Sequence, residues 1–195
     1  PIRSSMEVVQ LDNGGLELPL YMDKHAHDSD GIILVNRIKP HTAFHGTYES
    51  GLVKMSIIGL VKERLANAIH SFGIYGLKTL MPQAGRKILE TGKVLLGVGI
   101  VENAYDQTAI IETMTPAEIL EREPVLLDQA KANLPCFPLS EIDVLVVDQI
   151  GKNISGSGMD PNIVGRMRIR GEAEPEFPSI KSIVITDLTD VSHGN

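Results

Sequence analysis

Short apolar runs typical of strands alternate along this chain with segments of helical periodicity, and this alternation limits the possible folds. The short run at residues 31–36 is apolar up to Asn36 and does not alternate, as expected for a strand that is covered on both faces. Further strands are predicted at residues 6–11, 16–22, 93–101, 107–114, 142–147 and 180–185, and helices at residues 56–70, 82–90 and 115–133. This order predicts an α/β fold, a layered mixed sheet flanked by helices and Rossmann-like in type.

Two local signals predict where elements turn or begin. The glycine-rich turn at residues 12–15 lies between two strand-like runs and predicts a hairpin. Thr115, Pro116 and Glu118 match a helix start, with Thr as the cap, Pro in the first position and Glu in the third.

The domain organisation is simple at this level. There is no internal repeat, and the loop-rich stretch at residues 151–178 is not a convincing boundary, so we predict one α/β unit over residues 1–195. The chain begins at Pro1 and stops soon after a strand-like run, and we therefore expect it to be a fragment of a longer, two-domain protein.

Composition excludes several classes of function. The formal net charge is −7 and there is no Lys/Arg run, which argues against a nucleic-acid partner. No apolar stretch approaches the roughly 20 residues of a membrane-spanning helix. The single cysteine cannot form an internal disulfide, which together with the lack of a signal peptide favours a cytoplasmic location. A small-molecule ligand remains as the expected partner.

Lys54 is the only charged residue among residues 51–61. An ammonium without a partner is costly to bury, so such a lysine tends to lose its proton and become an amine nucleophile. Alternatively, its stem covers apolar surface while its charged end reaches water. Both interpretations stay open from the sequence alone.

The histidines give weaker signals. In a helix over residues 56–70 the apolar residues form one stripe, and His70 falls nearly opposite it. His70 is then either a solvent-facing residue at a helix end or a ligand that projects into a cleft. His41 and His45 lie in a polar loop after the strand at residues 31–36, at the sheet edge where α/β proteins place ligand sites.

A glycine-rich loop at residues 148–162 follows the predicted strand at residues 142–147. Its glycines permit close backbone approach to a ligand, and Lys152 could meet a carboxylate or phosphate. The glycine spacing does not match a P-loop.

Taken together, these segments resemble the nickel-pincer lactate racemase family. The resemblance rests on a Pro-His pair, a Ser-Gly segment that ends in Lys, and a His sixteen residues after that Lys, and it extends to the chain start and the glycine-rich loop. The matching segments are residues 1–9, 36–42, 49–55, 58–60, 70, 151–156 and 158–162.

The resemblance implies a 2-hydroxyacid racemase or epimerase, an isomerase that removes a hydride from the hydroxyl-bearing carbon and returns it to the opposite face. Its cofactor would be the nickel-pincer nucleotide, a pyridinium-3-thioamide-5-thiocarboxylic acid mononucleotide that carries nickel. By position, Lys54 would form the thioamide tether, Ser50 and Gly51 would lie at the cofactor, and His70 would complete the nickel coordination, since four ligands in a plane suit Ni(II).

The resemblance also assigns catalytic roles. His41 would be the general base, although the lactate racemases have a shorter gap before the Lys and His45 is an alternative. Gln149 and Lys152 resemble a Gln-x-x-Lys pair that contacts the substrate, a small 2-hydroxyacid or sugar acid. A second catalytic His and a carboxylate-binding Arg would belong to a region before Pro1, so the remainder of a protein about twice this length is an expected partner.

Two other functions compete with this one. The chain could be a non-catalytic ligand- or metal-binding structural domain, inactive as an isolated fragment. It could also carry an ordinary His-rich metal site with hydrolase chemistry, in which case zinc occupancy would be expected.

Overall fold

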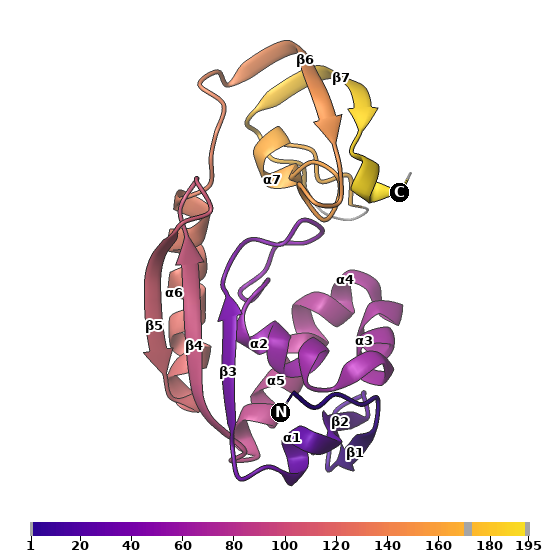
Figure 1. The fold of residues 1–195 in the computed structure, drawn as a ribbon, viewed down its shortest axis with the longest axis vertical. Coiled ribbons are helices and arrows are strands. Elements are labelled where there is room, and N and C mark those ends of the chain that lie inside the picture. The colour runs from indigo at the N-terminus through magenta and orange to yellow at the C-terminus, as the bar shows by residue number, and fades with distance from the viewer. Residues whose placement is uncertain (1, 170–172, 194–195) are drawn as a thin grey trace. The chain divides into compact units, whose positions relative to one another are not determined.

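The computed structural model describes residues 2–169 and 173–193, and its contacts cluster into two compact units. Unit 1 contains Pro1–Pro40 and His45–Asn133, and unit 2 contains His41–Phe44 and Leu134–Asn195. Helices and several sheets are present, so the predicted α/β class is confirmed (Figure 1). The Rossmann-like detail and the single unit over residues 1–195 stay predictions, and each unit is described by itself below.

Unit 1 is built on a three-stranded sheet of order β3-β4-β5 (Figure 1). β3 (Ile32–Arg37) pairs in parallel with β4 (Val94–Glu102), which pairs antiparallel with β5 (Thr108–Met114). The predicted mixed sheet is therefore confirmed in this unit. The strands lie where they were predicted, at residues 31–36, 93–101 and 107–114.

Coverage of β3 on both faces was the wrong expectation. Ile32 and Leu34 are buried, whereas Ile33 is 61% exposed and Val35 is 55% exposed. Successive side chains of a strand point to opposite faces, and only the face with Ile32 and Leu34 is covered among the described residues. Ile33 and Val35 on the other face are apolar but exposed. They make the run continuous in the sequence, although they are not part of the core.

The helices of unit 1 pack on the covered face and on one another. α5 (Met81–Glu90) and α6 (Pro116–Ala132) agree with the predicted helices. α6 begins with the predicted capping box, in which Thr115 and Glu118 satisfy each other's backbone N–H groups. Leu52, Ile57, Met81, Ile88 and Ile119 are fully buried and form part of the core between these helices and the sheet.

The predicted single helix over residues 56–70 is wrong. The structure has α2 (Leu52–Lys54), which continues into the π-helix η1 (Met55–Gly59), and a separate α3 (Lys62–Ser71). Lys62 adopts a left-handed conformation with φ of 59° and its Nζ lies 3.2 Å from Asp23 Oδ2. The chain therefore turns between the two helices, although the apolar spacing continues across the turn.

The remaining elements of unit 1 are short. β1 (Val8–Leu11) and β2 (Leu20–Asp23) form the predicted antiparallel hairpin, and α1 (Lys24–Asp28) follows. α4 (Gly73–Tyr75) and the π-helix η2 (Gly76–Leu80) connect α3 to α5 and were not predicted.

Unit 2 contains a two-stranded parallel sheet of β6 (Glu141–Ile150) and β7 (Ser179–Leu188). α7 (Pro161–Val164) lies between them in the sequence, and the 3₁₀ helix η3 (Asp190–Ser192) follows β7. In the described parts of both units, no helix is at once long enough and apolar enough to span a bilayer.

Candidate functional site

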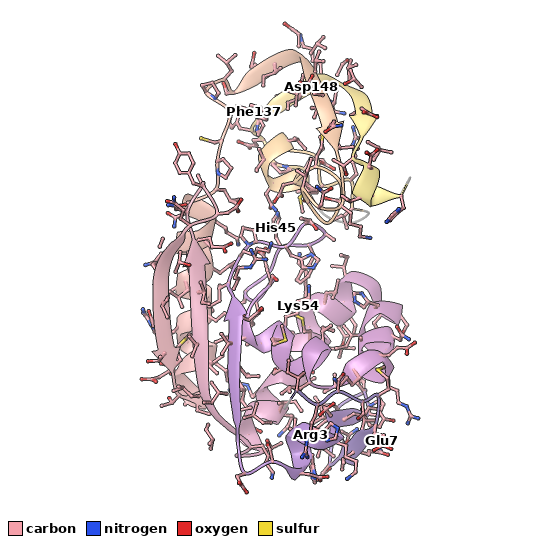
Figure 2. All side chains as sticks on the ribbon, in the orientation of Figure 1. Arg3, Glu7, His45, Lys54, Phe137 and Asp148 are labelled. Carbon is pink, nitrogen blue, oxygen red and sulfur yellow. The ribbon has the colours of Figure 1, made fainter. Side chains whose placement is uncertain are left out.

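The candidate site of unit 1 begins at the carboxyl end of β3, the edge where α/β proteins commonly bind ligands. Lys39 and Ser50 exchange backbone hydrogen bonds of 2.8 and 3.2 Å, which close the base of the loop between them. Figure 2 shows His45 in this loop and Lys54 on the helix that follows it. The loop thus leads directly from the sheet edge to the predicted tether.

Lys54 is a half-buried amine. It has no ion-pair partner among residues 2–169 and 173–193. Burial lowers the pKa of Lys54, and the like charge of Lys39 lowers it further. A larger share of this amine is therefore unprotonated at a given pH than for an exposed lysine, as covalent attachment requires.

A buried carboxyl group from α6 accepts a backbone hydrogen bond at the start of the Lys54 helix. Glu123 is 1% exposed, and its Oε2 accepts a hydrogen bond of 2.9 Å from the Val53 N–H. Its Oε1 is buried and makes no hydrogen bond within the described part of the chain. Burial raises the pKa of Glu123 to about 7, while the backbone N–H groups of Val53 and Leu52 oppose this rise.

Gly51 is placed against this carboxyl group. A Cβ on Gly51 would lie 2.2 Å from Glu123 Oε1 and 2.6 Å from its Cδ, so no larger residue fits without movement. The Gly51 carbonyl accepts hydrogen bonds from the Asn36 side chain at 3.1 Å and the Met55 N–H at 2.9 Å. The structure thus gives Gly51 a packing role, and the cofactor contacts of Ser50 and Gly51 stay predictions.

Tyr48 ties the loop to α6 as well. Pro124 lies inside α6 and has no N–H to donate to the carbonyl of Leu120. The Tyr48 hydroxyl replaces the missing N–H and donates a hydrogen bond to Leu120 O at 2.7 Å. The Leu120 carbonyl, which Pro124 leaves without its hydrogen bond inside the helix, therefore binds the loop through Tyr48.

His45 faces a buried carboxylate. Its Nδ1 lies 3.3 Å from both carboxylate oxygens of Glu49, whose side chain is fully buried. Glu49 also accepts from the Gly46 N–H at 3.2 Å and forms an ion pair of 2.8 Å with Lys131 of α6. The His45 side chain is 39% exposed, so solvent and small molecules can reach it.

His41 belongs to unit 2 and has a different hydrogen-bond pattern. Its Nδ1 accepts the Ala43 N–H at 3.0 Å, and its ring lies 4.6 Å from the ring of Phe44 between centroids. The His41 carbonyl accepts from the Asn162 side chain at 3.2 Å. With Nδ1 as an acceptor, the proton of the neutral ring is on Nε2. The role of His41 as a base stays a prediction.

His70 lies in the last turn of α3 and is exposed. The prediction that it faces away from the core is confirmed, since Leu65 and Ile69 of the same helix are buried. No hydrogen bond or ion pair joins His70 to Lys54 in the described chain, and its role as a nickel ligand stays a prediction. Residues 2–169 and 173–193 contain no group of three or more His, Cys, Asp or Glu that could hold a metal ion.

Gln149 and Lys152 lie at the carboxyl end of β6 in unit 2. Gln149 is still in the strand, lines a mostly apolar cavity of about 400 Å³, and donates to Asp187 Oδ2 at 3.3 Å. Lys152 is exposed in the following turn, where its N–H donates to Ser192 Oγ at 2.9 Å. Their role in substrate contact stays a prediction.

Sequence reasoning missed Glu49, Glu123 and Lys131. A signal was available for Glu123, because it occupies the buried stripe of α6 together with Ile119, Leu126, Leu127 and Ala130. Glu49 lies four residues after His45, but only the folded loop turns the two side chains toward each other. Lys131 gave no signal, since its partner is far away in the sequence.

Comparison with known proteins adds no family assignment. None of the protein-family models matches the chain, and the search of curated proteins found no match either.

Proposed function

We propose that this chain is the cofactor-tethering part of a nickel-pincer-dependent 2-hydroxyacid racemase or epimerase, with Lys54 as the site of covalent attachment. The proposal rests on the resemblance of the sequence motifs and on one observation of the structure. Lys54 is a half-buried amine with a lowered pKa, at the start of a helix that follows the sheet-edge loop.

The chemistry of the site suits the proposed group. A thioamide needs an unprotonated amine, and burial together with the charge of Lys39 favours this form of Lys54. The tricoordinate pincer would leave one nickel position for a protein ligand, so a single exposed imidazole such as His70 suffices and no larger cluster is required. When bound, the group supplies reversible acceptance of a hydride from the hydroxyl-bearing carbon.

The chain's own residues would hold the amine and move a proton. Glu123 and Gly51 fix the first turn of the Lys54 helix, and Lys54 itself is half-buried. His41 or His45 would take the hydroxyl proton of the substrate, a step for which an imidazole is suited near neutral pH. Gln149 and Lys152 would contact a small 2-hydroxyacid or sugar acid.

The test is the intact mass of the full-length protein after cofactor maturation. The wild type should carry a cofactor adduct, and tryptic peptides should place it on Lys54. Lys54→Arg keeps the positive charge but removes the amine nucleophile, so it should lose the adduct and the racemase activity toward a panel of 2-hydroxyacids. Lys39→Arg changes the neighbouring lysine in the same way and should keep the adduct.

An adduct of the same mass on Lys54→Arg would refute the assignment of the tether. If the matured wild type carries no adduct at all, the nickel-pincer function is refuted, and the alternative of a non-catalytic binding domain takes its place.

A further inference from the structure

Glu49, the carboxylate that His45 faces, has no role in the proposed function. Glu49 has a fully buried side chain, and its two oxygens lie 3.3 Å from His45 Nδ1. An ionised carboxylate only accepts hydrogen bonds, so the nitrogen that faces it must carry the proton. The proton on one ring nitrogen leaves the other nitrogen, Nε2, with a lone pair when the ring is neutral.

Glu49 itself forms an ion pair with Lys131 and accepts a backbone hydrogen bond from Gly46. Lys131 Nζ lies 2.8 Å from Glu49 Oε1, and the Gly46 N–H donates to the same oxygen at 3.2 Å. The cation offsets the cost of burying the carboxylate, which would be large without a partner. Because Lys131 belongs to α6, which packs against β4, the carboxylate is anchored to a helix that covers the sheet of unit 1.

From this geometry we propose that Glu49 is a positioning residue that, anchored by Lys131, holds the His45 ring with its proton on Nδ1 and so makes Nε2 the proton acceptor. The ring of His41 is arranged in the opposite way, because its Nδ1 accepts the Ala43 N–H. The two loop histidines thus differ in tautomer, and the half-buried His45 is the one set up as a base through Nε2.

The tautomer follows from the hydrogen bonds alone, whereas its consequence for catalysis rests on the proposed function. If His45 accepts the hydroxyl proton of a 2-hydroxyacid, loss of Glu49 should lower kcat and leave KM nearly unchanged, since Glu49 does not touch the substrate. The expected loss is about 10- to 100-fold, a part of what a general base contributes.

The direct test is the tautomer of each histidine in the ¹⁵N-labelled chain, measured by long-range ¹H–¹⁵N correlation spectra at a pH where the rings are neutral. His45 should show a protonated Nδ1 and an unprotonated Nε2, and His41 should show the reverse. Assignments come from His45→Gln and His41→Gln, each of which removes one set of signals.

Glu49→Leu should remove the tautomer preference of His45 and leave His41 unchanged, because leucine has no atom that accepts the Nδ1 proton. Its matched control is Glu112→Leu, which removes another carboxylate paired with α6, through Arg122, at a distance from His45 in the sequence. A structural role alone would lower stability in Glu49→Leu without changing the tautomer, and this result would overturn the proposal.

The wild-type spectrum tests the proposal even if Glu49→Leu does not fold. A protonated Nε2 on wild-type His45 overturns the proposal outright. This failure is distinguishable from failure of the proposed function, since the tautomer needs no cofactor. The expected tautomer without an adduct on Lys54 would keep the role of Glu49 and refute the racemase, while the adduct with the opposite tautomer would do the reverse.

Discussion

Replacing Glu123 with Gln should change how the stability of this protein depends on pH. Burial raises the pKa of Glu123 from 4.5 to about 7 in the folded chain. The folded state therefore binds this proton more tightly than the unfolded state. The stability that this proton contributes is fully present below pH 4.5 and is lost as the pH rises through about 7.

The size of the effect follows from the two pKa values. At ~1.36 kcal/mol per pKa unit, the full gap corresponds to about 3 kcal/mol. Between pH 5 and pH 8, the contribution of Glu123 to the free energy of unfolding should fall by roughly 2–3 kcal/mol. Glutamine has the same shape, can accept the Val53 N–H, and does not titrate, so Glu123→Gln should lack this fall.

The assay is urea unfolding followed by far-UV circular dichroism at pH 5 and pH 8 for both proteins. Other titrating groups change the free energy of unfolding of the two proteins alike. The cost of replacing the Glu123 carboxyl group with an amide is the same at both pH values. Both contributions cancel in the difference between wild type and variant. An equal change from pH 5 to pH 8 in the two proteins would refute the reasoning, because it would mean that Glu123 is ionised throughout.

Three further changes test the neighbouring residues. Gly51→Ala should destabilise the chain by about 1–3 kcal/mol in urea unfolding, because its Cβ would overlap Glu123 Oε1 at 2.2 Å. Lys39→Gln removes a like charge and should raise the pKa of Lys54, so competitive acylation read by mass spectrometry should label Lys54 more slowly at neutral pH. His70→Ala should change the free energy of unfolding by less than about 0.5 kcal/mol, since the residue is exposed, yet lower the nickel content of the matured full-length protein.

The first two of these changes have a matched control, and the third has a result that would contradict it. Gly46→Ala adds a methyl group where the nearest atom lies 3.6 Å away, so it should be tolerated far better than the change at Gly51. Lys93→Gln removes a charge that does not act on Lys54 and should leave its labelling rate unchanged. Unchanged nickel content in His70→Ala would contradict the role of His70 as a ligand.

The strands and the helices α5 and α6 could be predicted because their signals are local. The capping box at Thr115 and Glu118 lies within four residues, β4 follows a nearly continuous apolar run, and β5 is centred on the apolar residues Ala109–Ile111. The break between η1 and α3 could not, because the apolar spacing continues through it and Lys62 takes a left-handed conformation that its sequence does not favour. The open face of β3 was missed for a similar reason, since hydrophobicity does not reveal whether a face is covered.

The sequence by itself determined the α/β class, the isolation of Lys54 in an apolar run, and the position of His70 away from the core, because each depends on residues close together in the chain. Only the tertiary structure decided what surrounds these residues. Glu123 meets Val53 across 70 residues, and Lys131 meets Glu49 across more than 80, so neither pair leaves a periodic or local trace. The state of the Lys54 amine and the orientation of His45 depend on such contacts, because burial and nearby charges set the pKa of a group and its hydrogen-bond partners set its tautomer.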